Sequence, residues 1–73
     1  MKVYVICLER RHGLAWLYET VVSSKEAAEK YLEGVVGVWH RSTVYNRWES
    51  DWLDDNDDTY DYRWLIFEEE IDG

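Results

Sequence analysis

Apolar and β-branched residues run through the first ten positions of the chain and predict a strand. In "KVYVICLER" (2–10) the residues from Val3 to Leu8 are apolar on both faces of an extended chain, which indicates a central strand of a sheet. The tripeptide "RHG" then supplies a turn through Gly13, and "LAWLYETVV" (14–22) resumes the strand pattern. The sequence therefore predicts a hairpin of two strands.

A helix is predicted directly after the hairpin. Ser23 as N-cap and Glu26 three residues later have the spacing of a capping box. From residue 24 to 33 the apolar residues fall on one helical stripe, made of Ala27, Ala28, Tyr31 and Leu32. Gly34 then stands where a left-handed C-cap belongs. The pattern predicts one main helix over 24–33.

The segment "VVGVWHRSTVYNRWESDWL" (35–53) carries two conflicting patterns. Its valines favour a strand, whereas Tyr45, Trp48 and Trp52 at i, i+3 and i+7 favour a short helix. We expect an extended piece over its first half and a helical turn over its second half, from residue 45 to 53.

The chain closes with "TYDYRWLIFEEEI" (59–71), whose alternating apolar positions predict a long final strand. Together these elements predict a single domain over residues 1–73 in the α+β class. The expected architecture is a small antiparallel sheet in β-β-α-β order, with one main helix packed on one face and a short second helix.

Composition supports a folded chain that depends on its core alone. The 73 residues are 47% hydrophobic and 16% aromatic, enough apolar material for a core in one small domain. Cys7 is the single cysteine, so no intrachain disulfide can form and a reducing, cytoplasmic compartment is expected. The sequence shows no secretory leader pattern and no apolar run of about 20 residues that would span a membrane.

Negative charge is concentrated in the C-terminal third of the chain. Residues 1–48 hold seven Lys or Arg against five Asp or Glu, which gives +2, whereas residues 49–73 hold one cation against eleven acids, which gives −10. A field of that sign repels nucleic acids and membrane surfaces and attracts basic protein surfaces. The expected partner is therefore a basic protein, with no direct binding of nucleic acid or membrane.

The stretch "ESDWLDDNDDTYDY" (49–62) is the densest part of this charge, and a calcium loop is the first interpretation to test. With Asp54 at position 1, Asn56 and Asp58 occupy positions 3 and 5 of such a loop. The match fails where Thr59 replaces the required Gly and Leu65 replaces the bidentate Glu. We therefore expect no metal site here.

Other chemistry finds little support in the residues. Cys7, His12 and His40 lack the paired spacing of zinc ligands. The sequence contains no nucleophile elbow and no Gly-rich phosphate loop, and a domain this small has little room for a concave pocket. The expectation is a protein without enzymatic activity, metal or cofactor.

The acidic surface itself is the candidate functional site. DNA carries one charge per ~1.7 Å of helix axis, so a carboxylate-rich ridge can imitate phosphates for a basic groove. The three glutamates near the end of the final strand would continue the charge begun at the aspartates, with aromatic side chains as anchors. The predicted partner-binding residues are Asp51, Trp52, Asp54, Asp55, Asp57, Asp58, Tyr60, Asp61, Glu68, Glu69 and Glu70. The plainer interpretation is a solvated loop that keeps an aromatic-rich domain in solution.

In size, in its acidic "DWLDDNDDTYDY" and "EEEID" stretches and in its β-β-α-β plan, the chain resembles the small acidic proteins that phages encode against bacterial defences, notably anti-CRISPR proteins. This resemblance implies an inhibitor, acting in the bacterial cytoplasm, that occupies the nucleic-acid-binding surface of a CRISPR effector. It assigns no residue by itself.

The expected function is thus a non-enzymatic inhibitor that binds a basic nucleic-acid-binding protein. The main alternative is a self-associating module, a homodimer whose exposed aromatics pair the subunits while the acids serve solubility. A small cation-binding regulator and an antitoxin that caps a basic toxin are further alternatives.

Overall fold

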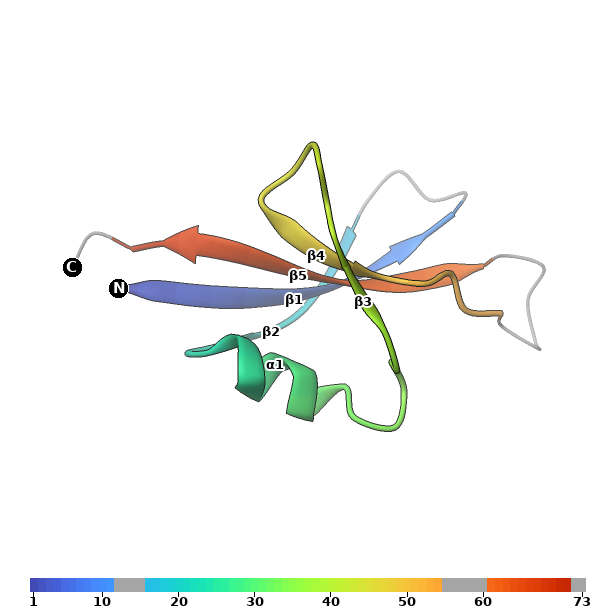
Figure 1. Cartoon of the computed structure of the whole chain (residues 1–73), viewed down its shortest axis with the longest axis horizontal. Coiled ribbons are helices and arrows are strands. Elements are labelled where there is room, and N and C mark those ends of the chain that lie inside the picture. The colour runs from blue at the N-terminus through green and yellow to red at the C-terminus, as the bar shows by residue number, and fades with distance from the viewer. Residues whose placement is uncertain (12–15, 55–60, 72–73) are drawn as a thin grey trace.

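The structure, a computed structural model, describes residues 1–11, 16–54 and 61–71. Over these residues the chain forms one five-stranded antiparallel sheet and one helix (Figure 1). The sheet has the spatial order β2-β1-β5-β4-β3. In chain order the elements are β1 (Lys2–Arg10), β2 (Trp16–Val22), α1 (Lys25–Tyr31), β3 (Trp39–Arg41), β4 (Arg47–Ser50) and β5 (Tyr62–Glu70).

Two long strands, β1 and β5, form the centre of the sheet. They pair antiparallel along their whole lengths, from Lys2 opposite Glu70 to Arg10 opposite Tyr62, and this brings Met1 beside Ile71. The first hairpin is confirmed, since β2 pairs antiparallel with β1, with an irregularity in register after Ile6. The turn predicted at 11–13 falls mainly outside the described residues.

The helix is shorter than the sequence suggests. It covers seven residues, and its N-cap is Ser24 instead of Ser23, with the Ser24 hydroxyl accepting a hydrogen bond from the backbone N–H of Ala27 at 3.1 Å. Beyond the helix, Gly34 adopts the expected left-handed conformation, with φ of 89°.

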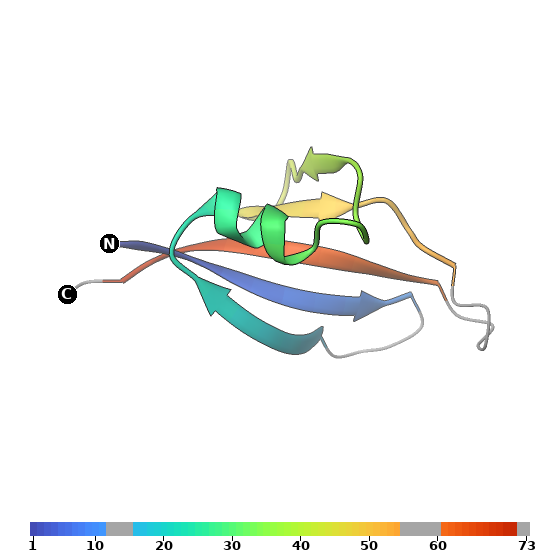
Figure 2. The same cartoon turned by 90° about the horizontal axis from the view of Figure 1, so that it is seen from below.

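Only part of the predicted helical stripe reaches the core. Ala28 and Leu32 are buried against Ile6 of β1 and Ile66 of β5, and Figure 2 shows α1 lying across one face of the sheet. Tyr31, predicted on the same stripe, is 51% exposed and donates its hydroxyl hydrogen bond to Glu19. The short helix therefore covers the sheet over a limited area.

The predicted second helix is wrong. Residues 47–50 form strand β4, which pairs with β5 through Trp48 opposite Ile66 and with β3 through Trp48 opposite Arg41. Period-two alternation wins here, because it places Trp48 against the core on the helix side and Arg47 on the other side. The pairing of β4 with both β5 and β3 stabilises a strand here, although the spacing of Tyr45, Trp48 and Trp52 favours a helix.

The predicted α+β class is consequently wrong as well. The protein is mostly β, one antiparallel sheet of five strands over the described residues with one short helix. The sequence pattern predicts helical structure over 24–33 and 45–53, whereas among the described residues only 25–31 is an α-helix, and β3 and β4 extend the sheet. In the described part of the chain no helix has the length and apolar character needed to cross a bilayer.

Candidate partner-binding surface

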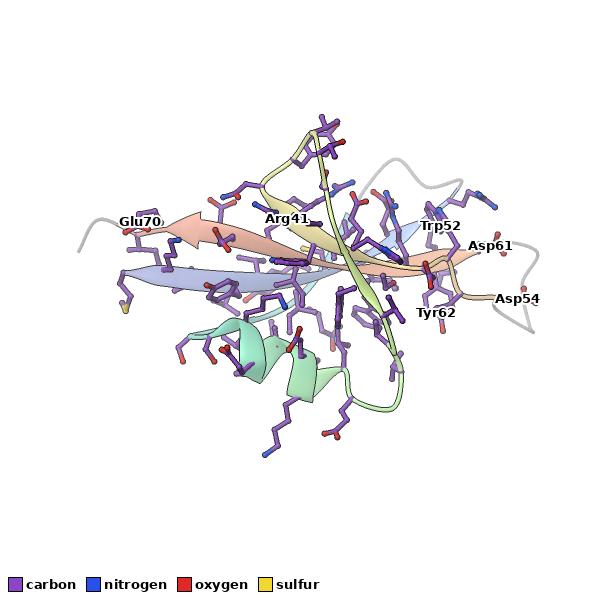
Figure 3. The ribbon with its side chains drawn as sticks, in the orientation of Figure 1. Arg41, Trp52, Asp54, Asp61, Tyr62 and Glu70 are labelled. Atoms are coloured by element: carbon purple, nitrogen blue, oxygen red, sulfur yellow. The ribbon has the colours of Figure 1, made fainter. Side chains whose placement is uncertain are left out.

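The predicted acidic residues lie at two opposite ends of the sheet, not on one ridge (Figure 3). Asp51, Asp54 and Asp61 lie where β5 begins, and Glu68–Glu70 lie where it ends, beside the N-terminus. The nine residues of β5 correspond to about 30 Å of extended chain. The continuous acidic ridge expected from the sequence is therefore not present among these residues. Asp55, Asp57, Asp58 and Tyr60 lie outside the described residues.

We call the first group, Asp51, Trp52, Asp54 and Asp61, the aspartate end. Its framework is an antiparallel bridge in which Leu53 and Tyr62 exchange backbone hydrogen bonds, at 2.6 Å for the Leu53 N–H and 2.9 Å for the Tyr62 N–H. This bridge holds together the two ends of the aspartate-rich segment 54–61. Because Tyr62 is the first residue of β5, the two residues that flank the segment, Leu53 and Tyr62, are joined to the centre of the sheet.

The carboxylates of the aspartate end differ in their partners. Asp61 accepts a hydrogen bond from the guanidinium of Arg11 at 2.7 Å, and the backbone N–H of Arg11 donates to the carbonyl of Asp61 at 2.9 Å. Asp51 lies 2.8 Å from the Nε2 of His40. Asp54 is exposed to solvent. Asp61 is the least exposed of these three carboxylates, and its side chain forms an ion pair with Arg11.

Trp52, predicted as an aromatic anchor, already has two cationic partners within the protein. The guanidinium groups of Arg11 and Arg63 lie over its ring, at 5.0 Å and 4.5 Å from the ring centroid. Such contacts hold cations against the negative face of the ring. Trp52 is half-buried, so it orients the two arginines beside the aspartates and offers a partner only part of its surface.

The second group, Glu68–Glu70, is the glutamate end, and cations of the N-terminus meet it. Glu70 lies 3.3 Å from the N-terminal ammonium group, and Glu68 lies 3.6 Å from the Nζ of Lys2. Glu69 is exposed on the opposite face of the strand. Two of the three glutamates thus have a cation beside them, which lowers the charge that this end can offer to a partner.

A cluster of four charged residues that sequence reasoning missed occupies the face of the sheet away from α1. Arg63 approaches Glu9 at 2.7 Å and Glu49 at 3.4 Å, and Arg47 approaches Glu49 at 2.8 Å and Glu9 at 3.9 Å. We call these residues the arginine–glutamate quartet. The sequence places Glu9 and Glu49 beside apolar residues of strand-like segments. The pairing of β1, β5 and β4 is needed to show which side chains meet.

The quartet explains how the sheet keeps its second face out of water without a second helix. Leu65, in the middle of that face, is fully buried. The guanidinium of Arg47 lies 4.4 Å from the ring of Tyr45 and 5.4 Å from the ring of Phe67, and Arg47 itself is 3% exposed. Arginine stems and stacked aromatic rings therefore cover apolar surface while their charges are matched by carboxylates.

The remaining candidate chemistry is limited. No three His, Cys, Asp or Glu side chains lie close enough together to hold a metal ion within residues 1–11, 16–54 and 61–71. Cys7 is buried as expected, and burial raises the pKa of its thiol, which disfavours the reactive thiolate. His40 is exposed, whereas His12 and the middle of the calcium-like segment lie outside the described residues.

No protein-family profile, curated protein sequence or solved structure matches the chain.

Proposed function

We propose that this protein is a non-enzymatic inhibitor that binds a basic nucleic-acid-binding protein through its aspartate end and the aspartate-rich segment 54–61. The charge of residues 49–73, at −10, matches the sign of the phosphates that such a protein binds. A CRISPR effector is the partner that the resemblance to anti-defence proteins suggests. Bacterial cytoplasm is the corresponding location.

The observation that supports this proposal most is the bridge between Leu53 and Tyr62. It joins the two ends of a segment in which residues 54–61 contain five aspartates and no cation. Joining the two flanking residues limits the separation of the ends of this segment, which lowers the entropy that a partner must remove when it binds. A free acidic tail would lack that advantage.

The cations nearest this segment are already engaged. Arg11 is bound to Asp61 and lies on Trp52, and Arg63 is bound to Glu9 and Glu49. Their positive charge is directed toward the base of the segment and the sheet. Carboxylates such as Asp54 can then present a field that favours association with basic surfaces.

The glutamate end supports the proposal less strongly. Its carboxylates Glu68 and Glu70 have cations beside them, and roughly 24 to 30 Å of strand separates them from Asp61. A single basic groove would have to be long to contact both ends. We assign the primary contact to the aspartate end.

The test is an affinity purification from bacterial lysate with three baits at low and high salt. The baits are the native protein, a variant with Asp54, Asp55, Asp57 and Asp58 changed to Asn, and a control with Glu19, Glu26, Glu29 and Glu33 changed to Gln. The two variants have the same net charge, so they separate the position of the acids from their number.

We expect the native bait and the Glu→Gln control to capture the same basic nucleic-acid-binding protein, and the Asp→Asn variant to lose it. Capture should weaken at high salt, because screening shortens the reach of exposed charges. Equal capture by all three baits, or capture that ignores salt, would remove the proposed role of the aspartate end.

A further inference from the structure

A tryptophan and a carboxylate at the aspartate end together hold a guanidinium group of the chain itself. Both residues lie at the end of the sheet where β5 begins (Figure 3). Asp61 accepts a hydrogen bond from Arg11 at 2.7 Å, and the same guanidinium lies 5.0 Å from the centroid of the Trp52 ring. This combination suits guanidinium, because the planar cation both donates hydrogen bonds to carboxylates and stacks on aromatic rings. We call Trp52 and Asp61 the guanidinium site.

Backbone pairing builds this site without help from the side chain that fills it. Each of its two residues directly precedes one partner of the antiparallel bridge between Leu53 and Tyr62. The backbone N–H of Arg11 also donates to the carbonyl of Asp61 at 2.9 Å, which continues the pairing of the first and last strands. Displacement of the Arg11 side chain would break none of these backbone hydrogen bonds.

The Arg11 side chain is bound in a way that allows exchange. It is 50% exposed, and the side chain of Asp61 is 33% exposed. An ion pair this open to water contributes little to stability, because solvent screens both charges. An arginine of a partner can therefore replace Arg11 on the ring and the carboxylate at little cost to the fold.

Arg63, the second arginine over the ring, is a fixed part of the sheet. Its guanidinium lies 4.5 Å from the centroid of the Trp52 ring. Its side chain is 19% exposed and pairs with Glu9 and Glu49. The ring thus contacts one guanidinium held inside the sheet and another at the surface. The one at the surface is the group that an incoming arginine can replace.

A second carboxylate lies beside the guanidinium site. The register of the bridge, continued by one residue, places Asp54 opposite Asp61. Asp54 is exposed, and like charges at opposite positions of paired strands repel each other. A partner segment that brings several guanidinium groups can neutralise both carboxylates.

We infer that the guanidinium site recognises arginine side chains of the partner in preference to lysine, and that Arg11 fills the site in the free protein. The inference rests on the proposed function and deepens it, because it narrows the basic partner to a protein with an exposed arginine-rich segment. Lysine carries the same charge, but its ammonium group is more strongly hydrated and lacks the planar fork that stacks on a ring and pairs with a carboxylate.

The experiment compares two peptides of equal charge, octa-arginine and octa-lysine, by isothermal titration calorimetry with the full chain. Both peptides experience the same long-range field, so the ratio of their affinities isolates recognition of the guanidinium group. The native protein should bind octa-arginine roughly two- to fivefold more tightly, as expected for a cation–π contact at an exposed site. Asp61→Asn should lower this ratio toward unity. The control Glu33→Gln, which removes one charge from an exposed position beyond α1, should leave the ratio unchanged.

A second pair of variants tests the role of Arg11. Arg11→Met keeps an apolar stem and empties the site, so it should strengthen the binding of octa-arginine more than that of octa-lysine. Lys30→Met removes the same charge from an exposed position on α1 and should strengthen both equally. This pair preserves the test if Asp61→Asn unfolds the protein.

The outcomes separate this inference from the proposed function. Equal affinities of the native protein for the two peptides, or a ratio that changes with neither Asp61→Asn nor Arg11→Met, would overturn the inference and leave the proposed function standing. Failure of both peptides to bind would overturn the inference together with the proposed function, because the acidic end would then hold no basic segment.

Discussion

Arg47→Ala should destabilise the protein more than the same substitution at Arg11 or Arg63, two other arginines that form ion pairs in the described part of the chain. Arg47 is 3% exposed, and its Nε donates to Glu49 at 2.8 Å. Without it, Glu9 and Glu49 would each lose one of the cations beside them, and both carboxylates are largely buried. Removing one member of a buried ion pair costs about 3–5 kcal/mol, since the other charge stays in a poor solvent.

The lower limit of that range is appropriate, because the carboxylates of Glu9 and Glu49 keep 15% and 19% exposure. A loss of about 3 kcal/mol compares with a total unfolding free energy of roughly 4–11 kcal/mol for a chain of this length. The corresponding drop in Tm is roughly 12–24 °C for a domain this small.

The assay is urea unfolding followed by tryptophan fluorescence, together with thermal unfolding followed by circular dichroism. Arg11→Ala is the matched control, since Arg11 also has a short ion pair, to Asp61 at 2.7 Å, but is half exposed. It should cost less than about 1 kcal/mol. The double variant Arg47→Met, Glu49→Met keeps apolar volume and leaves Glu9 paired with Arg63, so it should recover most of the loss. Equal losses for Arg47→Ala and Arg11→Ala would refute the argument that burial makes the quartet important.

Three further predictions follow from single residues. Gly34→Ala should lower the unfolding free energy by about 1 kcal/mol in urea, because φ is 89° there, while Gly37→Ala, without a positive φ, should stay within about 0.5 kcal/mol. Cys7 should react slowly with a thiol reagent in the native protein and rapidly in urea, because it is buried. Burial also raises the pKa of its thiol in the folded state, so the thiol's contribution to the unfolding free energy is present at neutral pH and should be lost as pH rises through the folded pKa. The hydrogen bond from the Tyr31 hydroxyl to the Glu19 carboxylate raises the pKa of Tyr31, so Glu19→Gln should lower that pKa. An NMR titration of Tyr31 that is the same in both proteins would contradict this prediction.

Those parts of the fold that depend on neighbouring residues were predictable from the sequence. The apolar run of β1 and the left-handed position of Gly34 are local features, and both were predicted correctly. The helix start was displaced by one residue because Ser23 and Ser24 can each cap a helix, and only Ser24 has its hydroxyl at the N–H of Ala27. Sequence alone offers no means of choosing between two adjacent serines.

The remaining parts depend on contacts between distant segments. Trp48 was assigned to a helix by its spacing, yet it pairs with Ile66 in the centre of the sheet. A local pattern cannot include the energy of that pairing. Sequence reasoning also identified the excess of acids without the cations that meet them. Lys2 reaches Glu68, and Arg11 reaches Asp61 fifty positions away, because β1 and β5 are antiparallel.

The pairing of β1 with β5 would have made the quartet predictable. Once those two strands are aligned from end to end, Glu9 lies opposite Arg63. The addition of β4 on the far edge of β5 brings in Glu49 beside Leu65. The candidate site on the sheet is thus a consequence of topology, whereas the aspartate segment is a consequence of composition.

The most direct test of the proposed function is the affinity of the captured basic protein for the native chain, measured against a short DNA duplex as competitor and across a salt series. The proposal predicts that duplex and inhibitor exclude each other, that affinity falls steeply with salt, and that the Asp54, Asp55, Asp57, Asp58 to Asn variant loses both the affinity and the salt dependence. A partner that binds the duplex and this protein at the same time, with an affinity unchanged by the four substitutions, would contradict it.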